Sequence, residues 1–393
     1  MALVGFPDDG PRVLSVYEGF FSGGARVLHT AVVRSLDATT AQRHAVLGLT
    51  NRSVREGTVQ TAEADLSHQR LRAAGVPVEA LERETHEPLT PFHLAAVERA
   101  AAQADVVLSL KEQPLIALRE VERPVVACLH RSDPEHSGAG LEQLVELTER
   151  GVVVAAVCCA RSTQAAYHAA TGIPLDQLPV IPNGTDLRRF RSSPQDRAEV
   201  RRDLGVVGDA PVVLLSARFD PMKDVGLFVR SAATFLRRYP DAHAVLCGAG
   251  MVATNPALAD LLAAAGAPTD RVHLLGIRAD MPRLYNGADL VAITSAYGEA
   301  APLSLLEGMA CGAVPVTTDV GDAALMVADP RLVIPDRDPD AVARVWEAAF
   351  EQREEHTERI LRHRQRLSDQ RCFDAYAALI RRLAAPQALE VAV

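Results

Sequence analysis

The sequence predicts an α/β protein of two doubly wound domains, each built on a parallel sheet, and three observations support this. The chain has 393 residues, which at roughly 150 residues per domain suggests two domains. Hydrophobic residues make up 48% and charged residues 23% of the chain, as in a soluble globular protein with sizeable cores. Short apolar runs alternate with helix-like stretches, and this βαβ rhythm is typical of doubly wound α/β domains.

Six strands are expected in the first half of the chain. Each run is rich in Val, Leu and Ile and is bounded by Gly, Pro, Asp or charged residues, which suits a strand buried on both faces of a parallel sheet. The runs span residues 12–18, 43–49, 105–110, 124–130, 152–158 and 178–182. Helical patterns lie between them over residues 25–34, 91–104 and 141–148.

The rhythm pauses near residues 185–205 and then restarts. Strands are expected over residues 212–217, 244–248, 272–276, 290–295, 314–318 and 332–335, and residues 340–383 predict two or three helices. We therefore expect Rossmann-like domains over residues 1–185 and 186–371. We also expect a C-terminal helix, about residues 372–393, to pack back on the first domain.

The balance of charge bears on the kind of partner. With 50 acidic and 41 basic residues the formal net charge is −9, so general nucleic-acid binding is not expected. Only Lys111 and Lys223 are lysines, and the other 39 basic residues are arginines. Such a bias is typical of a GC-rich genome, which makes each retained lysine a candidate for a specific role.

The cysteines and the hydropathy pattern bear on location. Five of the six cysteines lie in apolar or helix-like runs, with no C-x-x-C pair and no His at ligand spacing, which favours buried thiols in a reducing compartment. The first residues lack the basic and apolar regions of a signal peptide, and no apolar run reaches the ~18–20 residues of a bilayer span. We therefore expect a cytoplasmic protein without a transmembrane segment.

The strongest chemical signal lies over residues 290–318. A buried strand ends at Ser295, and a loop leads to a helix that begins near Pro302. Glu299 precedes this helix and could act as a simple cap, whereas Glu307 lies within an otherwise apolar helix and so needs a polar partner. The helix N-terminus offers amides to an anion, and these belong to Ala300, Ala301 and Leu303.

These residues carry a family resemblance. The spacing Glu299-x7-Glu307, followed by G-M-A-C-G and a V-P-V-T-T-D strand, resembles the signature of retaining GT-B glycosyltransferases of glycosyltransferase family 4. The resemblance covers nearly the whole chain and is strong over about residues 180–320. It implies the GT-B architecture, in which two Rossmann-like domains face each other across a cleft.

Further segments match the family's donor-binding motifs. In L-L-S-A-R-F-D-P-M-K-D, Arg218 and Lys223 match the family's Arg and Lys that hold the donor diphosphate, although a solvated loop pair is the alternative from the residues alone. The segment H-L-L-G-I-R-A-D resembles the base-binding strand, which implies nucleobase contacts from the backbone of Ile277 and Arg278. The chain departs from the family at Ala300-Ala301-Pro302, where G-F or G-x-P is frequent, so sugar contacts there would use backbone amides.

Two features of the first domain also match the family. Gly23-Gly24 stands at a helix start, where glycine lets the backbone approach a phosphate or sugar closely. A Gly-Gly pair alone is a weak signal, and the family's glycine loop strengthens it. His130 ends an apolar run at the position of a family His that contacts the donor sugar, although a lone His is more often structural.

The resemblance implies a hexosyltransferase that moves a sugar from a nucleotide diphosphate sugar, expected to be a UDP-sugar, with retention. The catalytic candidates are His130, Arg218, Lys223 and Glu299. Glu307 is expected to bind the ribose hydroxyls and Glu299 the sugar hydroxyls. No D-x-D motif lies in a plausible strand-end loop, so no metal and no cofactor other than the donor is expected.

The acceptor is predicted from acids that follow the strands of the first domain. These acceptor-side candidates are Glu18, Glu112, Asp133 and Glu135, with Lys111 beside them. Four acids favour an amine-bearing small molecule, such as an aminocyclitol of aminoglycoside antibiotic biosynthesis, while ordinary solvated loop acids are the alternative. Cell-wall, lipid or thiol-precursor acceptors stay open, as does a sugar-nucleotide binder or epimerase that transfers nothing. The oligomeric state is not predicted.

Overall fold

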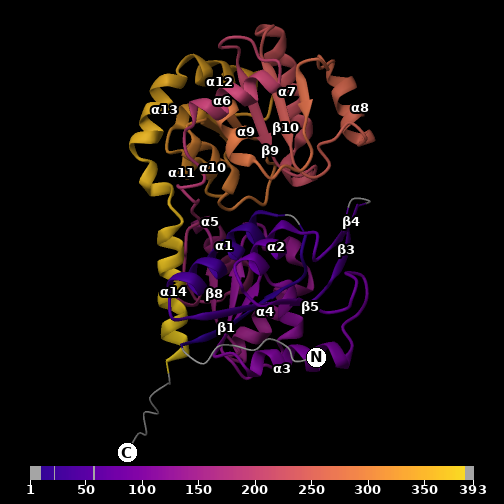
Figure 1. Cartoon of the computed structure of the whole chain (residues 1–393), viewed down its shortest axis with the longest axis vertical. Helices are drawn as coiled ribbons and strands as arrows, with labels where there is room; N and C mark the ends of the chain where they lie inside the picture. The colour runs from indigo at the N-terminus through magenta and orange to yellow at the C-terminus, as the bar shows by residue number, and fades with distance from the viewer. Residues whose placement is uncertain (1–9, 22, 56–57, 386–393) are drawn as a thin grey trace, which may run out of the picture. The chain divides into compact units, whose positions relative to one another are not determined.

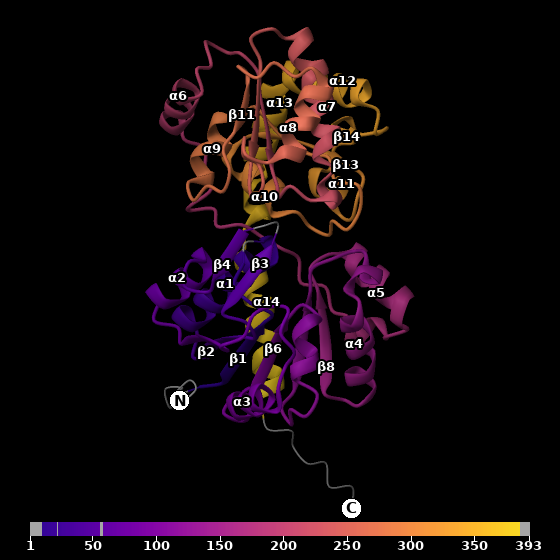
Figure 2. The same cartoon turned by 90° about the vertical axis from the view of Figure 1, so that its right-hand side faces the viewer.

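The computed structural model describes residues 10–21, 23–55 and 58–385. The chain divides into two compact units, the N-terminal unit (Met1–Asn183 with Gln370–Val393) and the C-terminal unit (Gly184–Asp369). Each unit contains a six-stranded parallel sheet with helices packed around it (Figure 1, Figure 2). The α/β class with two parallel-sheet domains is therefore confirmed.

The sheet of the N-terminal unit has the strand order β5-β2-β1-β6-β7-β8. Its strands are β1 (Arg12–Tyr17), β2 (Arg43–Gly48), β5 (Val78–Ala80), β6 (Val106–Leu110), β7 (Val125–Leu129) and β8 (Val153–Cys158). Every residue of the central strands β6 and β7 is buried, as their continuous apolarity predicts for strands covered on both faces. A separate antiparallel hairpin joins β3 (Arg52–Arg55) to β4 (Thr58–Thr61).

The helices of the N-terminal unit begin and end at local signals in the sequence. They are α1 (Gly24–Thr39), α2 (Leu66–Ala73), α3 (Pro91–Ala102), α4 (Ala139–Glu149), α5 (Arg161–Thr171) and α14 (Gln370–Ala384). Thr90 forms a capping box at the start of α3, with proline in the first turn. Gly172 ends α5 in the left-handed conformation that glycine adopts without strain.

The C-terminal helix α14 belongs to the N-terminal unit. It lies beside α1 in both views, where the Gln42 side-chain amide donates to Ala377 O at 3.0 Å and the rings of His29 and Tyr376 lie 6.4 Å apart (Figure 1, Figure 2). The expected helix over about residues 372–393 corresponds to α14, and residues 386–393 of that expectation lie outside the described residues. Residues 370–384 therefore pack against the N-terminal unit.

The sheet of the C-terminal unit has the order β11-β10-β9-β12-β13-β14. Its strands are β9 (Val212–Ser216), β10 (His243–Cys247), β11 (Val272–Leu274), β12 (Leu290–Ile293), β13 (Val314–Thr318) and β14 (Val333–Ile334). Its helices are α6 (Pro194–Asp203), α7 (Val225–Arg238), α8 (Pro256–Ala265), α9 (Met281–Gly287), α10 (Leu303–Cys311), α11 (Ala323–Val327), α12 (Pro339–Glu351) and α13 (Arg353–Arg362).

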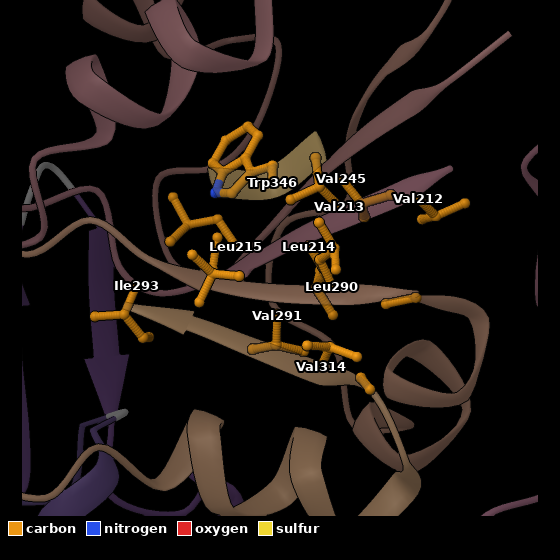
Figure 3. Packing of buried hydrophobic residues seen from close by; sticks show 14 of the residues in the cluster. Val212, Val213, Leu214, Leu215, Val245, Leu290, Val291, Ile293, Val314 and Trp346 are labelled. Carbon is orange, nitrogen blue, oxygen red and sulfur yellow. The ribbon is translucent and has the colours of Figure 1, made fainter. Parts of the chain in front are cut away.

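One tryptophan anchors the core of the C-terminal unit. Trp346 of α12 is fully buried, and its ring lies 5.2 Å from that of Phe228 and 5.9 Å from that of Phe235. Figure 3 shows Trp346 over a layer of Val, Leu and Ile side chains from β9, β10, β12 and β13. Large aromatic side chains contribute much of the apolar burial that stabilises such a layer.

The structure differs from the sequence-based expectations at the weakest strands. Residues 178–182 do not form a strand, because Pro179 and Pro182 lack the N–H groups of a ladder, and only one bridge joins Val180 to Cys158. Residues 332–335 form only the two-residue strand β14 after a 3-10 turn. The three-residue strand β5 and the β3–β4 hairpin were not predicted, since their apolar signals are short.

The cysteines are free and buried, as the apolar runs predict. Among the described residues, no helix has both the length and the apolar character of a bilayer span.

Candidate active site

The donor-side candidates of the C-terminal unit gather beyond the carboxyl ends of its central strands. Arg218 and Lys223 follow β9, and Glu299 follows β12. Since β9 and β12 are paired and parallel, their carboxyl ends lie side by side, and both loops begin there. Open α/β sheets bind ligands at the carboxyl ends of their strands. The sequence order therefore translates into spatial proximity here.

The Lys223 ammonium and the Glu299 carboxylate form an ion pair. Nζ of Lys223 donates to Oε1 of Glu299, and the hydroxyl of Ser295 donates to the same oxygen at 2.6 Å. Glu299 is only 5% exposed, so these donors compensate the loss of hydration of its charge. The structure thus brings together two residues that the sequence assigned to one donor.

The backbone beside Lys223 is held against the end of β12. The hydroxyl of Thr294 donates to the carbonyls of Lys223 at 3.1 Å and Asp224 at 3.2 Å. The amide of Ala296 donates to Met222 O at 2.8 Å. These bonds hold the loop that carries Lys223 in one place relative to the loop that carries Glu299.

Arg218 has a partner that the sequence did not suggest. Its guanidinium lies 3.0 Å from the carboxylate of Asp220, whose other oxygen accepts the amide of Met222 at 2.9 Å. Gly248, at the end of β10, has a φ of 138°, and a Cβ there would lie 2.0 Å from Ala217 O. Only glycine lets the G-A-G segment lie so close to the backbone that precedes Arg218.

Glu307 has the polar partner that its apolar helix demanded. The hydroxyl of Tyr285, on α9, donates to Oε2 of Glu307 at 2.9 Å. Tyr285 is 1% exposed, and burial, together with the nearby charge of Glu307, raises the pKa of its phenol well above the usual value. The phenol therefore stays protonated and orients the carboxylate. Tyr285 was missed, because no sequence signal links it to a residue 22 positions away.

The loop before α10 is packed against a glycine turn. A Cβ on Gly321, whose φ is 63°, would lie 2.1 Å from Glu299 O and 2.8 Å from Ala300 O. The amide of Asp322 donates to Ala300 O at 2.8 Å. Ala300 is buried and Ala301 partly buried, and α10 begins at Leu303 with Pro302 as its N-cap rather than its first residue. The first amides of α10 have no acceptor within the helix, as at any helix start.

The expected nucleobase segment follows β11. Ile277 is 54% exposed, and the guanidinium of Arg278 makes two bonds to Asp280, at 2.8 and 2.7 Å. Gly276 precedes them with a φ of 58°, and its amide donates to Met251 O at 2.9 Å. The role predicted for Ile277 and Arg278 depends on their backbone and stays a prediction.

The glycine pair of the N-terminal unit stands where the sequence predicts it. Gly23 is the N-cap of α1, and Gly24 is its first residue. Gly23 has extended backbone, and a Cβ there would meet nothing within 4 Å. Neither packing nor backbone strain therefore requires Gly23 to be glycine.

His130 follows β7 and is held neutral. Burial, with the neighbouring charges of His29 and Lys111, lowers the pKa of His130 to about 3, and its Nε2 is buried without a hydrogen-bond partner among the described residues. Lys111 has a φ of 72°, a left-handed conformation that is rare outside glycine. The hydroxyl of Ser109 donates to Lys111 O at 2.8 Å, and the amide of Lys111 donates to Cys128 O at 3.0 Å.

Two of the four acceptor-side acids are buried, which their positions in the sequence did not predict. Glu112 is completely buried, accepts the Ser137 hydroxyl at 2.8 Å, and has its pKa raised by burial. Asp133 is 4% exposed and makes two bonds to the Arg131 guanidinium, at 2.8 and 2.7 Å. Both acids are therefore bound within the unit, since a strand-end position does not determine which way a side chain turns.

The other two acids lie nearer to solvent. The side chain of Glu135 is 69% exposed, and Glu18 is partly buried.

Among the described residues, no group of three or more His, Cys, Asp or Glu side chains is arranged to hold a metal ion.

The family relationship follows from comparison with known proteins. Residues 196–366, which include Arg218, Lys223, Glu299 and Glu307, match the family described as Glycosyl transferases group 1. This region therefore resembles a glycosyltransferase group 1 domain. The match agrees with the resemblance that the sequence motifs predicted, at the level of the group 1 family, and the roles assigned to the strand-end residues stay predictions.

Curated relatives match parts of the chain. The D-inositol 3-phosphate glycosyltransferase of Nocardia farcinica is 36% identical over 166 residues, which cover 40% of this chain and 36% of that protein. The enzyme of the same name from Saccharomonospora viridis is 32% identical over 296 residues, which cover 70% of this chain and 66% of that protein. The matches thus span less than two thirds of the length of these relatives.

Solved structures share the fold. Anabaena Alr3699/HepE in complex with UDP and glucose has a TM-score of 0.79 and 23% identity, covering 95% of this chain and 100% of that chain. Sucrose-phosphate synthase from Thermosynechococcus elongatus has a TM-score of 0.72 and 15% identity, covering 95% and 99%. The two units therefore have the folds of GT-B glycosyltransferase domains.

Proposed function

We propose that this chain is a retaining glycosyltransferase that moves a hexosyl group from a UDP-sugar to a small polar acceptor. One observation carries the proposal. Within the region that matches the glycosyltransferase group 1 family, Lys223 is the only lysine of the C-terminal unit, and its ammonium pairs with the buried carboxylate of Glu299. The pair lies beyond the carboxyl ends of the strands, where α/β sheets bind ligands. A cation and a hydroxyl-binding acid held together there suit the two ends of a sugar diphosphate.

In this proposal the C-terminal unit binds the donor. Lys223 and Arg218 bind the diphosphate, because a point charge and a planar guanidinium together stabilise the charge of the leaving group. Glu307, oriented by Tyr285, accepts the ribose hydroxyls, and Glu299 accepts hydroxyls of the sugar. Structural neighbours contain UDP and UDP-glucose, which supports this class of donor.

The remaining donor contacts come from the backbone. The amides of Ala300, Ala301 and Leu303 donate to phosphate or sugar oxygens, helped by the positive end of α10. The backbone at Ile277 and Arg278 holds the base. We infer that the positive groups of this unit make a metal unnecessary for the departure of the diphosphate.

The N-terminal unit completes the reaction in this proposal. The neutral imidazole of His130 exchanges a hydrogen bond with a hydroxyl of the donor sugar, and the Gly23-Gly24 start of α1 lets sugar or phosphate approach the backbone. The acceptor oxygen bonds to the anomeric carbon on the face from which the phosphate oxygen departs. That phosphate oxygen takes the proton of the acceptor, so no enzyme base is consumed.

For the acceptor we propose a cyclitol. The curated relatives are named for D-inositol 3-phosphate, and two of the four acids that favoured an amine are bound inside the N-terminal unit. A cyclitol phosphate is therefore the first candidate, with Lys111 as a candidate cation, and an aminocyclitol of antibiotic biosynthesis is the second. A nucleotide-sugar donor and six free thiols support a cytoplasmic location.

Release of nucleoside diphosphate tests this proposal. The protein is incubated with UDP-, GDP- and ADP-sugars, each alone, with myo-inositol 1- or 3-phosphate, and with 2-deoxystreptamine. UDP release that depends on one acceptor is the expected result, and the α configuration of the product, read by NMR, tests retention. A protein that binds UDP-sugar without releasing UDP to any acceptor is a sugar-nucleotide binder, and the proposal is then wrong.

A further inference from the structure

The residue after Lys223 has a backbone conformation that its side chain disfavours. Asp224 has φ 39° and ψ 61°, and among the described residues only Lys111 and Ala328 share a positive φ without being glycine. Such a conformation costs free energy for a residue with a Cβ, so the surrounding structure must maintain it. Aspartate tolerates it better than most residues, because its short side chain forms local hydrogen bonds.

Both carboxylate oxygens of Asp224 are used. Oδ1 accepts the amide of Leu227 at 2.9 Å and so caps α7. Oδ2 forms an ion pair with the guanidinium of Arg337, which lies 113 residues later in the chain, after β14. The cap explains an aspartate at this position, but it does not explain the arginine.

Arg337 also reaches the other loop of the candidate site. While its Nη2 binds Asp224, its Nη1 donates to the carbonyl of Ser295 at 2.8 Å. Ser295 is the residue whose hydroxyl binds Glu299 Oε1, and Asp224 directly follows Lys223, whose ammonium binds that same oxygen. One planar guanidinium therefore joins the side chain of Asp224, the residue after Lys223, to the backbone of Ser295, the residue whose hydroxyl binds Glu299.

The ion pair between Arg337 and Asp224 is partly exposed, so it can fix the geometry of the two loops while adding little to the stability of the fold. The side chains of Arg337 and Asp224 are 40% and 26% exposed, so solvent screens their attraction and the pair contributes little to folding. The planar fork of arginine nevertheless fixes the direction of two bonds at once, which a point charge does not. A small displacement of a group that binds a reacting phosphate can cost a large factor in rate.

We propose that Arg337 is a positioning residue, which through Asp224 and Ser295 sets where Lys223 and Glu299 stand relative to each other. This inference rests on the proposed function, in which Lys223 binds the donor diphosphate and Glu299 the sugar. UDP lacks the transferred sugar that Glu299 binds, so in UDP binding Arg337 acts through Lys223 alone. Its effect must therefore disappear when the Lys223 ammonium is absent.

A double-mutant cycle on UDP binding tests the inference. Calorimetry measures the Kd for UDP of the wild type, Arg337→Ala, Lys223→Ala and the double variant. We expect Arg337→Ala to weaken UDP binding about 3- to 10-fold, and the double variant to bind within about twofold of Lys223→Ala. Losses that multiply in the double variant, or a Kd for Arg337→Ala within twofold of the wild type, overturn the inference.

Two further variants protect the test against trivial outcomes. Arg238→Ala is the matched control, because its ion pair with Glu347 is equally exposed, at 39%, and lies between α7 and α12 away from the candidate site; it should leave the Kd unchanged. Asp224→Asn keeps the oxygen that caps α7 and tolerates the left-handed backbone, but it removes the charge that faces Arg337. It should therefore weaken UDP binding as Arg337→Ala does. It replaces Arg337→Ala if that variant fails to fold. Wild-type protein that binds no UDP and releases none from any donor overturns the proposed function, and this inference with it.

Discussion

Lys223 Nζ and the Ser295 hydroxyl meet on a single oxygen of Glu299, Oε1. The three side chains come from the ends of two adjacent parallel strands, so the relationship depends on the topology of the sheet as well as on the residues. Glu299 is 5% exposed, so these two donors supply hydrogen bonds that solvent does not. In the proposed mechanism, this contact holds the cation that binds the diphosphate, Lys223, against the acid that binds the sugar, Glu299.

The hydrogen bond from Tyr285 to Glu307 is expected to matter for nucleotide binding. Tyr285→Phe removes the donor that orients the carboxylate, so UDP should bind about 2- to 10-fold more weakly while the ring still fills the core. Calorimetry with UDP measures the effect. Tyr239→Phe is the matched control, since Tyr239 makes a similar bond, 3.1 Å long, to Glu351 at an exposed site. An equal effect of the two variants contradicts the role of Glu307.

The close approach of Gly321 to the Glu299 loop predicts sensitivity to a single methyl group. Gly321→Ala places a Cβ 2.1 Å from Glu299 O, so the loop must move, and UDP release should fall at least about tenfold. Gly266→Ala carries the same backbone strain, with a φ of 60° against 63°, but meets nothing within 4 Å. It should lose stability and keep its activity. A Gly321→Ala enzyme as active as Gly266→Ala would falsify the assigned place of this loop.

The N-terminal unit should lose stability on mild acidification. Burial lowers the pKa of His29 to about 4, and burial with the neighbouring His29 lowers that of His44 to about 3, from the usual 6.5. Below about pH 6.5 the unfolded chain therefore binds more protons than the folded one, and the free energy of unfolding falls by up to ~1.4 kcal/mol per pH unit for each group. The loss continues down to the folded pKa values.

Urea denaturation between pH 7.5 and 4.5 measures this loss. His44→Asn should flatten the dependence on pH, because one buried group no longer titrates. Val46→Ala, in the same strand, serves as the control, because it removes buried apolar atoms and no titrating group; it should lower the stability and leave the slope unchanged. Parallel curves for His44→Asn and the wild type contradict the assignment of the slope to this residue.

Removal of metal ions should leave the reaction intact. In the proposed mechanism Arg218, Lys223 and the start of α10 supply the positive charge that stabilises the departing diphosphate. Activity in EDTA is therefore expected to equal that in buffer, with the UDP released assayed by a metal-independent method. Loss of activity on chelation, restored by added Mg²⁺ or Mn²⁺, contradicts the metal-free mechanism.

Much of the fold could be predicted because the buried strands are long and apolar. The runs over residues 212–217 and 290–295 contain β9 and β12, and their parallel pairing follows from the βαβ rhythm. Lys223 could be named as a candidate site residue because it is one of two lysines in an arginine-rich chain and lies in a recognisable motif. Where the signal was short, as at β5, or was interrupted by prolines, as at residues 178–182, the prediction failed.

The rest of the candidate site depends on contacts that sequence spacing does not reveal. Arg337 and Asp224 are 113 residues apart, and nothing in either local sequence indicates their pairing. The position of Glu112 after a strand was predicted, but its burial was not, since the direction of that side chain depends on how Ser137 packs against it. Strand ends therefore indicate where a site lies, while the tertiary structure determines which side chains face it.

Lys223 binds the diphosphate of a sugar nucleotide in the proposed mechanism, and the rate of UDP release by Lys223→Ala tests this role. Wild-type protein and the variant are compared at saturating UDP-sugar and acceptor, at a temperature where both are folded by circular dichroism. We expect kcat to fall by about 100-fold or more, as when one preorganised donor to a developing charge is removed, with the KM for the acceptor nearly unchanged. A Lys223→Ala protein that turns over as fast as the wild type would contradict this role.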